Sequence, residues 1–255
     1  MPDGKRIYAI GDIHGHLRLL DDLLGQIVED AARYPGFEKT LIFLGDYIDR
    51  GPDSNGVLQR LCTLDIPGFN LVFICGNHEE MMTIFLEEPS RGLVWLRNGG
   101  DETLSSYGIA VDSAAEKTPD VMADYSRLFL AAVPREQRDF LRALELSYEV
   151  GDYLFVHAGI RPGRAIAQQE PEDLLWIREP FLKSHRNHGK VVVHGHSIRF
   201  EPEVYPDEVA PRRIGIDTGA YKNGVLTCLA LVGDKRMLIQ AGESSEDDEG
   251  SLADE

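Results

Sequence analysis

Five short clusters of glycine, aspartate, asparagine, histidine and arginine contain the residue types that bind metals and phosphate. They are Gly11-Asp12-Ile13-His14-Gly15, Gly45-Asp46-Tyr47-Ile48-Asp49-Arg50-Gly51, Gly76-Asn77-His78-Glu79, His157-Ala158-Gly159 and His194-Gly195-His196-Ser197. Imidazole, carboxylate and amide oxygen suit zinc, iron or manganese, whereas an all-oxygen set would suit calcium or magnesium. The clusters contain no cysteine. The sequence therefore predicts a transition-metal site without thiolate ligands.

Each cluster directly follows an apolar run that predicts a strand. The runs are residues 6–10, 40–44, 71–75, 153–156 and 191–193. Ligands of open α/β sheets bind outside the carboxyl ends of the strands, so we expect the five clusters to meet in one place. Asp12 and His14 are two residues apart and would project to the same side of an extended chain. Asp46 is central in the series and is the natural carboxylate to bridge two cations about 4 Å apart, the arrangement that clamps a phosphoryl group.

The remaining pattern predicts a layered α/β domain in which helices alternate with these strands. Apolar residues recur at helical spacing between residues 17 and 31, namely Leu17, Leu20, Leu24, Ile27, Val28 and Ala31. Asp53 or Ser54 is expected to cap a second helix, and Met82 and Phe85 lie in a third. Residues 119–146 also read as helical, with a break at Pro134.

Composition limits the classes of function. The chain has 255 residues, 43% hydrophobic content and a formal net charge of −17, which argues against nucleic acid and anionic membrane surfaces as partners. No apolar run approaches the roughly 20 residues of a membrane-spanning helix, and we expect a cytoplasmic protein. The cysteines are Cys62, Cys75 and Cys228, and their wide spacing predicts reduced packing residues. One domain is expected over residues 1–242, followed by an acidic, disordered tail at 243–255.

The motifs GDIHG, GDYIDRG, GNHE, HAG and GHS, in this order, resemble the signature of the phosphoprotein phosphatase family. The similarity is greatest to the small bacterial and lambda-type serine/threonine protein phosphatases, which also have segments resembling residues 95–104 and 216–220. The matches run from about residue 7 to residue 232. The resemblance implies the fold of a calcineurin-like metallophosphoesterase, a four-layer α/β/β/α sandwich.

The resemblance also implies two divalent cations per chain, with manganese expected and iron or zinc as alternatives. Carried over position by position, it assigns Asp12, His14 and Asp46 to one cation. It assigns Asp46, Asn77, His157 and His196 to the other.

The implied reaction is hydrolysis of a phosphate monoester by attack of a metal-activated water on phosphorus. His78 would be the general acid, oriented by Asp49. The phosphate would be bound by Arg50, Arg178 and Asn77, and a planar guanidinium suits this because it directs two donors at phosphate oxygens. Phosphorylated proteins or peptides are the implied substrates, with dual specificity toward tyrosine and the oligomeric state left open.

Other functions share this metal framework. A diadenosine tetraphosphate (dinucleoside polyphosphate) hydrolase or a cyclic phosphodiesterase is the main alternative, but the former typically departs from the family pattern at the position of Asp49. A non-enzymatic, metal-dependent phosphoprotein-binding scaffold would need neither Arg50 nor His78. We expect Glu79 to orient or cap and His194 to support His196, while Trp95 and Trp176 could each be core or substrate platform.

Overall fold

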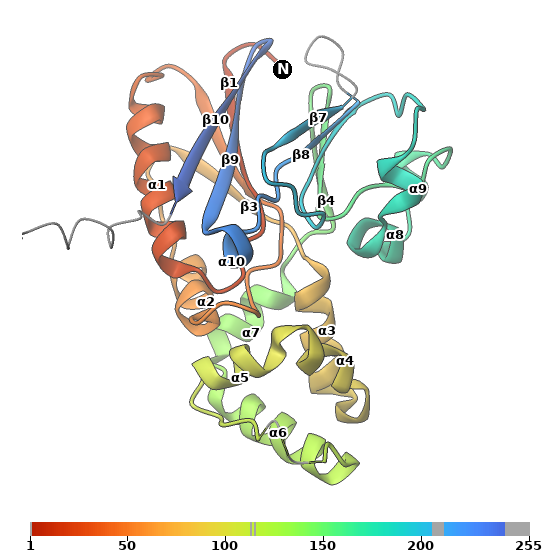
Figure 1. The fold of residues 1–255 in the computed structure, drawn as a ribbon. Coiled ribbons are helices and arrows are strands. Elements are labelled where there is room, and N and C mark those ends of the chain that lie inside the picture. The colour runs from red at the N-terminus through yellow and green to blue at the C-terminus, as the bar shows by residue number, and fades with distance from the viewer. Residues whose placement is uncertain (1, 113, 115, 206–211, 243–255) are drawn as a thin grey trace, which may run out of the picture.

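The structure is a computed structural model, and it describes residues 2–112, 114, 116–205 and 212–242. Two five-stranded sheets form its centre, with the strand orders β10-β9-β1-β2-β3 and β4-β5-β6-β8-β7 (Figure 1). The first sheet contains β1 (Lys5–Ile10), β2 (Glu38–Phe43), β3 (Phe69–Phe73), β9 (Val225–Val232) and β10 (Lys235–Gly242). The second contains β4 (Ser147–Val150), β5 (Tyr153–Val156), β6 (Val191–His194), β7 (Glu203–Tyr205) and β8 (Arg213–Gly215).

Parallel strands occupy the part of each sheet that leads to the polar clusters. In the first sheet β1 pairs in parallel with β2, and β2 with β3. In the second, β5 pairs in parallel with β6, and β6 with β8. Antiparallel strands complete both sheets: β9 and β10 extend one, and β4 and β7 form the two edges of the other.

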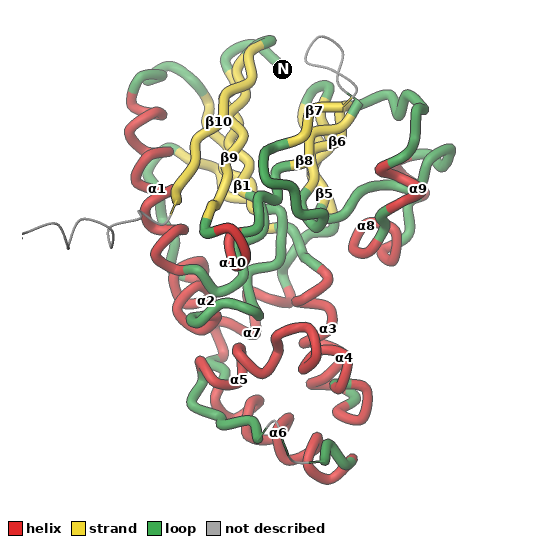
Figure 2. The backbone as a smooth tube through the Cα atoms, viewed as in Figure 1, coloured by secondary structure: helices red, strands yellow, loops and turns green. Residues whose placement is uncertain are grey.

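Helices cover the outer faces of the two sheets (Figure 2). The first sheet is covered by α1 (Leu17–Ala32) and α2 (Ser54–Cys62), and the second by α8 (Pro171–Trp176) and α9 (Glu179–Leu182). Alternate side chains of β1 explain the layering, because Tyr8 packs toward α1 whereas Ile7 and Ala9 pack between the sheets. β1 is buried on both faces, which is why residues 6–10 read as a nearly continuous apolar run. The four-layer α/β/β/α sandwich is confirmed.

A helical lobe extends below the sheets in Figure 1. It contains α3 (Asn77–Glu87), η1 (Pro89–Arg91), α4 (Leu93–Trp95), the π-helical turn η2 (Leu96–Gly100), α5 (Asp101–Ser106), α6 (Pro119–Ala132) and α7 (Arg135–Arg142). The short helices η3 (Ile166–Gln168) and α10 (Ala220–Asn223) lie elsewhere. Trp95, Phe85 and Phe129 are buried together at the centre of the lobe. The lobe is therefore packed around aromatic rings.

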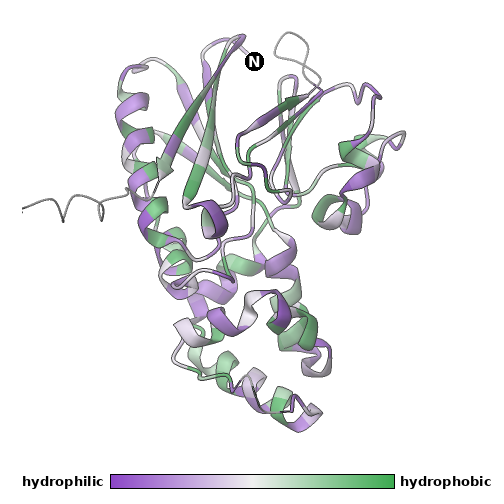
Figure 3. Cartoon of the chain, viewed as in Figure 1, coloured by the Kyte–Doolittle hydropathy of each residue, from purple (hydrophilic) through white to green (hydrophobic). Residues whose placement is uncertain are grey.

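Most predicted elements are present, with differences at their ends and faces. Asp53 caps α2 by accepting a hydrogen bond from the Gly56 amide. The helical pattern predicted up to residue 146 ends at Arg142, and the break at Pro134 is confirmed. Val28 is 46% exposed, so it lies outside the buried stripe of α1. In Figure 3 the colours of hydrophobic and hydrophilic residues alternate along this helix.

Three further findings concern expectations from the sequence. The three cysteines are free thiols, and only Cys228 is fully buried. No helix in the described part of the chain is both long and apolar enough to cross a membrane. The predicted acidic tail at 243–255 lies outside the described residues.

Candidate active site

The loops that follow the parallel strands are hydrogen-bonded to one another. The amides of Ile13 and His14, after β1, both donate to the Asp46 carbonyl after β2, at 3.0 and 2.9 Å. The Gly195 amide, after β6, donates to the His157 carbonyl after β5 at 2.8 Å. These bonds join the neighbouring loops of each sheet.

The two sheets also meet through site residues. His157 Nδ1 lies 2.9 Å from the carbonyl oxygen of Leu44 in the first sheet's loops. The His196 amide donates to the Asp12 carboxylate, with the nearer oxygen at 3.0 Å. Gly195 permits this approach, because a Cβ there would lie 2.0 Å from Asp12 Oδ1. The clusters predicted from the sequence are thus brought together.

Asp46 lies at the centre of the imidazole groups. Its Oδ1 is 3.4 Å from His157 Nε2, and its Oδ2 is 3.6 Å from His14 Nε2 and 3.9 Å from His78 Nε2. Two groups of potential ligands result, His14 with Asp46 and His78, and Asp46 with His157 and His196; in each the ligand atoms lie within 4.8 Å of one another. Asp46 belongs to both groups, while Asp12 belongs to neither of these three-residue groups of the described residues.

The imidazole tautomers fit cation binding. His14 Nδ1 lies 2.8 Å from the Ile48 carbonyl, and His157 Nδ1 faces a carbonyl in the same way. A carbonyl oxygen only accepts, so Nδ1 carries the proton and Nε2 presents its lone pair. Burial lowers the pKa of His14 to about 3, against the opposing charge of Asp46, and lowers the pKa of His157 as well. These rings are therefore neutral and suited to hold a metal.

Two further features indicate that a metal ion would fit here: a close contact between two hydrogen-bond acceptors, and a buried imidazole nitrogen without a hydrogen-bond partner. With Nδ1 of His157 protonated, its Nε2 lone pair faces Asn77 Oδ1 at 2.9 Å, a pairing of two acceptors that a cation would resolve. His196 Nε2 is buried without a hydrogen-bond partner in the described structure, and burial lowers the pKa of His196 to about 2. The donor set of nitrogen and oxygen atoms thus fits transition-metal cations.

Three carboxyl groups, of Asp12, Asp46 and Asp217, are buried close enough to affect one another's ionisation. Burial, followed by the charges of Asp217 and Asp46, raises the pKa of Asp12 well above its usual range. Burial likewise raises the pKa of Asp217 to about 6. At Asp46 burial acts in the same direction, but the surrounding histidines outweigh it and lower the pKa. Divalent cations would relieve the repulsion among these carboxylates.

His78 and Asp49 form a buried pair beside Asp46. His78 Nδ1 lies 2.6 Å from Asp49 Oδ2, and the two side chains are 1% and 0% exposed. Burial lowers the pKa of His78, but the charge of Asp46 and the hydrogen bond and charge of Asp49 outweigh it, so the pKa lies above its ordinary value. His78 Nε2 faces the metal-ligand group, so the geometry suits either proton donation or metal ligation.

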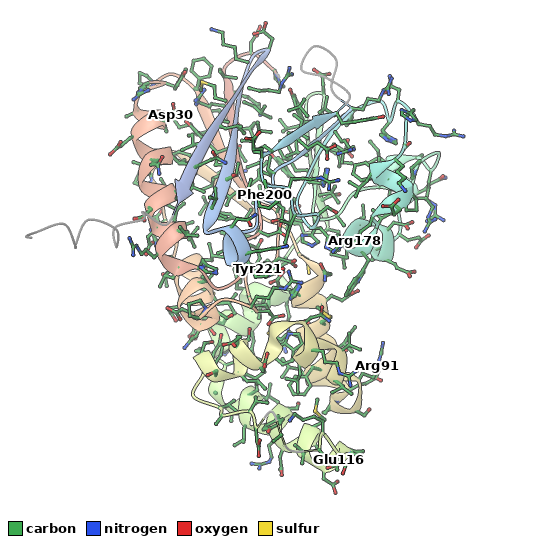
Figure 4. All side chains as sticks on the ribbon, in the orientation of Figure 1. Asp30, Arg91, Glu116, Arg178, Phe200 and Tyr221 are labelled. Carbon is green, nitrogen blue, oxygen red and sulfur yellow. The ribbon has the colours of Figure 1, made fainter. Side chains whose placement is uncertain are left out.

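The two arginines lie in different surroundings. Arg50 is half-buried, with Nη1 3.4 Å from His14 Nε2 and its guanidinium over the ring of Tyr221. Arg178 is exposed at the start of α9. Burial and the charge of His157 lower the pKa of His196, and the charge of Arg178 makes a smaller contribution in the same direction. Figure 4 shows Arg178 on the side of the second sheet and Tyr221 on the side of the first. The guanidinium groups of both arginines therefore lie beside the buried ligand cluster.

Backbone strain is concentrated at this site. The non-glycine residues with positive φ in the described chain are His14, Asp46, Asp49, Arg50 and His196, at 47°, 52°, 73°, 67° and 61°. All five belong to the residue set predicted from the sequence. Such left-handed conformations cost free energy and persist where the surroundings hold them, which is typical of functional sites.

Several supporting residues clarify what the sequence left open. Glu79 accepts hydrogen bonds from the amides of Asp46, Tyr47 and Gly76 at 2.8–2.9 Å, confirming that it orients the loops. Trp95 is buried, whereas Trp176 is 37% exposed with its ring 6.4 Å from that of His196.

Sequence reasoning missed the positions of Asp217 and Tyr221 beside the site. Both lie in or next to the segment 216–220, whose resemblance to the phosphatases was the available signal.

Comparisons with known proteins identify the family to which this chain belongs. Residues 5–219 match the family model of the calcineurin-like phosphoesterases. Serine/threonine-protein phosphatase 2 of Escherichia coli is 29% identical over 230 residues, which cover 88% of this chain and 91% of that protein. An asymmetrical bis(5'-nucleosyl)-tetraphosphatase of Anoxybacillus flavithermus is 28% identical over 241 residues, covering 86% and 88%.

The fold is also similar to a solved crystal structure described as a putative diadenosine tetraphosphatase. It has a TM-score of 0.63 and 21% sequence identity, and the match covers 95% of this chain and 97% of the other. At this identity the likeness concerns the fold. With the family match over most of its length and His/Asp groups that could hold metal at its strand ends, the chain belongs to the calcineurin-like phosphoesterase family and is a metallophosphoesterase.

Proposed function

We propose that this metallophosphoesterase is a two-metal phosphomonoesterase that dephosphorylates phosphoserine and phosphothreonine in proteins. The observation that carries the proposal is the buried pair of His78 and Asp49, whose Nδ1 and Oδ2 atoms are 2.6 Å apart, next to Asp46. An alkoxide is a poor leaving group and benefits from protonation as its bond to phosphorus breaks. A proton donor held by a buried carboxylate is the feature that such a substrate needs.

The proposed metal ligands are the carboxylate, imidazole and amide side chains at and around Asp46. Asp12, His14 and Asp46 would hold one cation, and Asp46, Asn77, His157 and His196 the other. The nitrogen and oxygen donors suit manganese, with iron or zinc as alternatives. Bound divalent cations would supply Lewis acidity toward phosphoryl oxygens.

His78 would deliver its proton from Nε2. Its Nδ1 is engaged by Asp49, so Nε2 is the ring atom directed toward the ligand cluster, 3.9 Å from Asp46 Oδ2. Asp49 would keep the ring orientation fixed and stabilise its charged form. The donor atom and the group that orients it are therefore on opposite sides of one ring.

Arg50 and Arg178 would bind the phosphate, together with the Asn77 side chain. Each guanidinium remains charged and can direct two N–H groups at phosphate oxygens. Arg50 is already close to the cluster, since its Nη1 lies 3.4 Å from His14 Nε2. Arg178, being exposed, would approach from the side of the second sheet.

A dinucleoside polyphosphate hydrolase is the second candidate, because relatives include bis(5'-nucleosyl)-tetraphosphatases such as that of Anoxybacillus flavithermus. Its leaving group is a nucleotide, which departs as a phosphate anion and depends less on a proton donor than an alkoxide does. The His78–Asp49 pair therefore favours the monoesterase. The acidic balance of the chain, a formal net charge of −17, also disfavours a highly anionic substrate.

The deciding experiment compares kcat/KM for a phosphoserine peptide, a phosphotyrosine peptide, diadenosine tetraphosphate and a cyclic phosphodiester with manganese at one pH. We expect the phosphoserine peptide to be the best substrate and Asp46→Asn to abolish its turnover. A higher kcat/KM for diadenosine tetraphosphate would favour the second candidate. Binding of phosphopeptide without turnover of any of the four would favour the scaffold.

We further propose that residues 1–242 contain the whole catalytic domain. Residues 243–255 are rich in aspartate, glutamate and serine and have little apolar surface with which to pack. Deleting them should leave turnover of a small substrate and the melting temperature nearly unchanged. A loss of several degrees would show that the segment packs against the domain.

A further inference from the structure

The carboxylate of Asp49 is surrounded by hydrogen-bond donors from three parts of the chain. Trp95 Nε1 lies 2.9 Å from Oδ2 and 3.1 Å from Oδ1, and Thr103 Oγ1 lies 2.6 Å from Oδ1. His78 Nδ1 completes the set at 2.6 Å from Oδ2. Asp49, Thr103 and Trp95 are 0%, 0% and 1% exposed, so water does not compete for these bonds.

Trp95 and Thr103 belong to the helical lobe and not to the strand-end loops. Trp95 closes α4 and Thr103 lies in α5, 46 and 54 residues after Asp49 in the sequence. Thr103 Oγ1 also lies 3.0 Å from the Asp49 amide nitrogen, so one hydroxyl contacts both the backbone and the carboxylate of Asp49. The lobe is thus attached directly to the partner of His78.

Asp49 needs such external support because its backbone is strained. Its φ of 73° lies in the left-handed region, which is costly for a residue with a Cβ. A carboxylate on such a backbone has no regular secondary structure to fix its direction. Donors on both of its oxygens restrict the directions in which it can point.

Resting on the proposed function, we propose that Trp95 and Thr103 are positioning residues that fix the Asp49 carboxylate and, through it, the orientation of the His78 imidazole. Hydrogen bonds to a charged group are stronger than those between neutral groups. The three donors around the Asp49 carboxylate therefore keep Oδ2 directed at Nδ1 of His78. Nε2 of the same ring then keeps its direction toward the ligand cluster. The lobe therefore contributes to catalysis without touching substrate.

A purely structural role for Trp95 would not require its N–H group. The ring packs against Phe85 and Phe129 at centroid separations of 4.9 and 5.6 Å, and a phenylalanine could make similar contacts. Likewise valine would match the shape of Thr103. Trp95→Phe and Thr103→Val therefore remove the donors while keeping most of the packing.

Tyr107→Phe is the matched control. Tyr107 lies in the same lobe, donates its hydroxyl to Gln137 and packs on Phe129 at 5.1 Å, but it makes no contact with Asp49 among its described interactions. This variant also removes one hydroxyl hydrogen bond from the lobe. Any general loosening of the lobe should appear in it as well.

The kinetic test compares a phosphoserine peptide with p-nitrophenyl phosphate, whose leaving group departs without protonation. Trp95→Phe and Thr103→Val should each lower kcat for the peptide by roughly 10-fold, the scale of one hydrogen bond to a charged group. The loss on p-nitrophenyl phosphate should be smaller, and Tyr107→Phe should affect neither. Neither substitution should lower kcat further in a His78→Asn background, because positions that act through one residue are not additive. Equal losses on both substrates, or the same loss without His78, would overturn the positioning role.

A second readout does not depend on activity. The ¹⁵N chemical shifts of the His78 imidazole, assigned by comparison with His78→Asn, report its hydrogen bond with Asp49. They should change in Trp95→Phe and Thr103→Val and stay at wild-type values in Tyr107→Phe. Unchanged shifts in both variants would overturn the positioning role, whichever ester the chain hydrolyses. Changed shifts in a chain without phosphomonoesterase activity would keep the positioning role and reject the proposed function.

Discussion

The guanidinium carbon of Arg50 lies 4.6 Å from the centroid of the Tyr221 ring. The same ring meets the imidazole of His14 edge-on, at a centroid separation of 5.2 Å. On its other side, Arg50 donates its amide to the Gly99 carbonyl at 3.3 Å, and a Cβ on Gly99 would lie 2.6 Å from that amide nitrogen. Arg50 is therefore held between α10 and the helical lobe.

Tyr221→Leu should weaken phosphate binding because it removes the aromatic face under Arg50. Cation–π contacts contribute about 0.5–2 kcal/mol, so kcat/KM should fall by roughly 2- to 30-fold, mainly through a higher KM. Inhibition by inorganic phosphate should weaken in parallel. Tyr221→Phe retains the ring and is the control. If the phenylalanine variant lost as much as the leucine variant, the hydroxyl rather than the ring would be responsible.

Asp46→Asn should reduce binding of both cations, because Asp46 is common to the two ligand groups. Asn77→Ala and His196→Ala should chiefly affect one. Metal stoichiometry by atomic emission, measured after dialysis at several free manganese concentrations, distinguishes these variants. Two cations bound at wild-type affinity in Asp46→Asn would contradict the proposed bridge.

The ion pair of Glu203 and Arg213 should stabilise the second sheet in a pH-dependent way. Arg213 directs Nη1 and Nη2 at the two carboxylate oxygens, each at 3.0 Å, and hydrogen bonding to Arg213 lowers the pKa of Glu203 from 4.5 to about 2. A lowered folded-state pKa means that the contribution is complete above pH 4.5 and is lost as the pH falls toward 2.

Melting temperatures measured from pH 7 to pH 2 test this ion pair. Glu203→Gln should melt below the wild type at pH 7, and the difference should shrink below pH 4.5. Glu201→Gln, an exposed neighbour, should show no such trend. A difference between wild type and Glu203→Gln that did not depend on pH would exclude the carboxylate charge as its cause.

The sequence predicted the strand-end clusters well because local signals coincide there. The parallel strands β1, β2, β3, β5 and β6 read as apolar runs, and each is followed by potential ligands. The short parallel strand β8, which contains an arginine and a glycine, was not predicted. The antiparallel strands were not predicted individually. The edge strands β4 and β7 are short, and β10 alternates only partly between buried and exposed residues. In β9, six consecutive residues are buried, so it has no alternation either.

Contacts made to the site by residues outside the strand-end clusters could not be predicted. Trp95 reaches Asp49 only because the lobe folds back under the first sheet's loops, and nothing local to Trp95 indicates a carboxylate partner. Tyr221 reaches Arg50 because β8 and β9 belong to different sheets, so that the segment between them crosses the site. These contacts depend on tertiary packing, which periodicity and motif spacing do not encode.

His78→Asn gives the most direct test of the proposed reaction. If His78 donates a proton, the variant should retain its metals and fold but lose about 10²–10⁴-fold in turnover of a phosphoserine peptide. Asp49→Asn should cause a milder loss, since it weakens both the orientation of the imidazole and its charged form. Metal content and melting temperature of both variants serve as controls.

The dependence on the leaving group separates the two roles that the geometry permits for His78. An alkyl phosphate needs its oxygen protonated, whereas p-nitrophenolate leaves readily as an anion, so loss of an acid should affect the former more. A metal ligand lost from the group of His14, Asp46 and His78 would instead lower metal content and reduce turnover of both substrates alike. Retained metal with unequal losses therefore identifies a proton donor, and reduced metal with equal losses identifies a ligand.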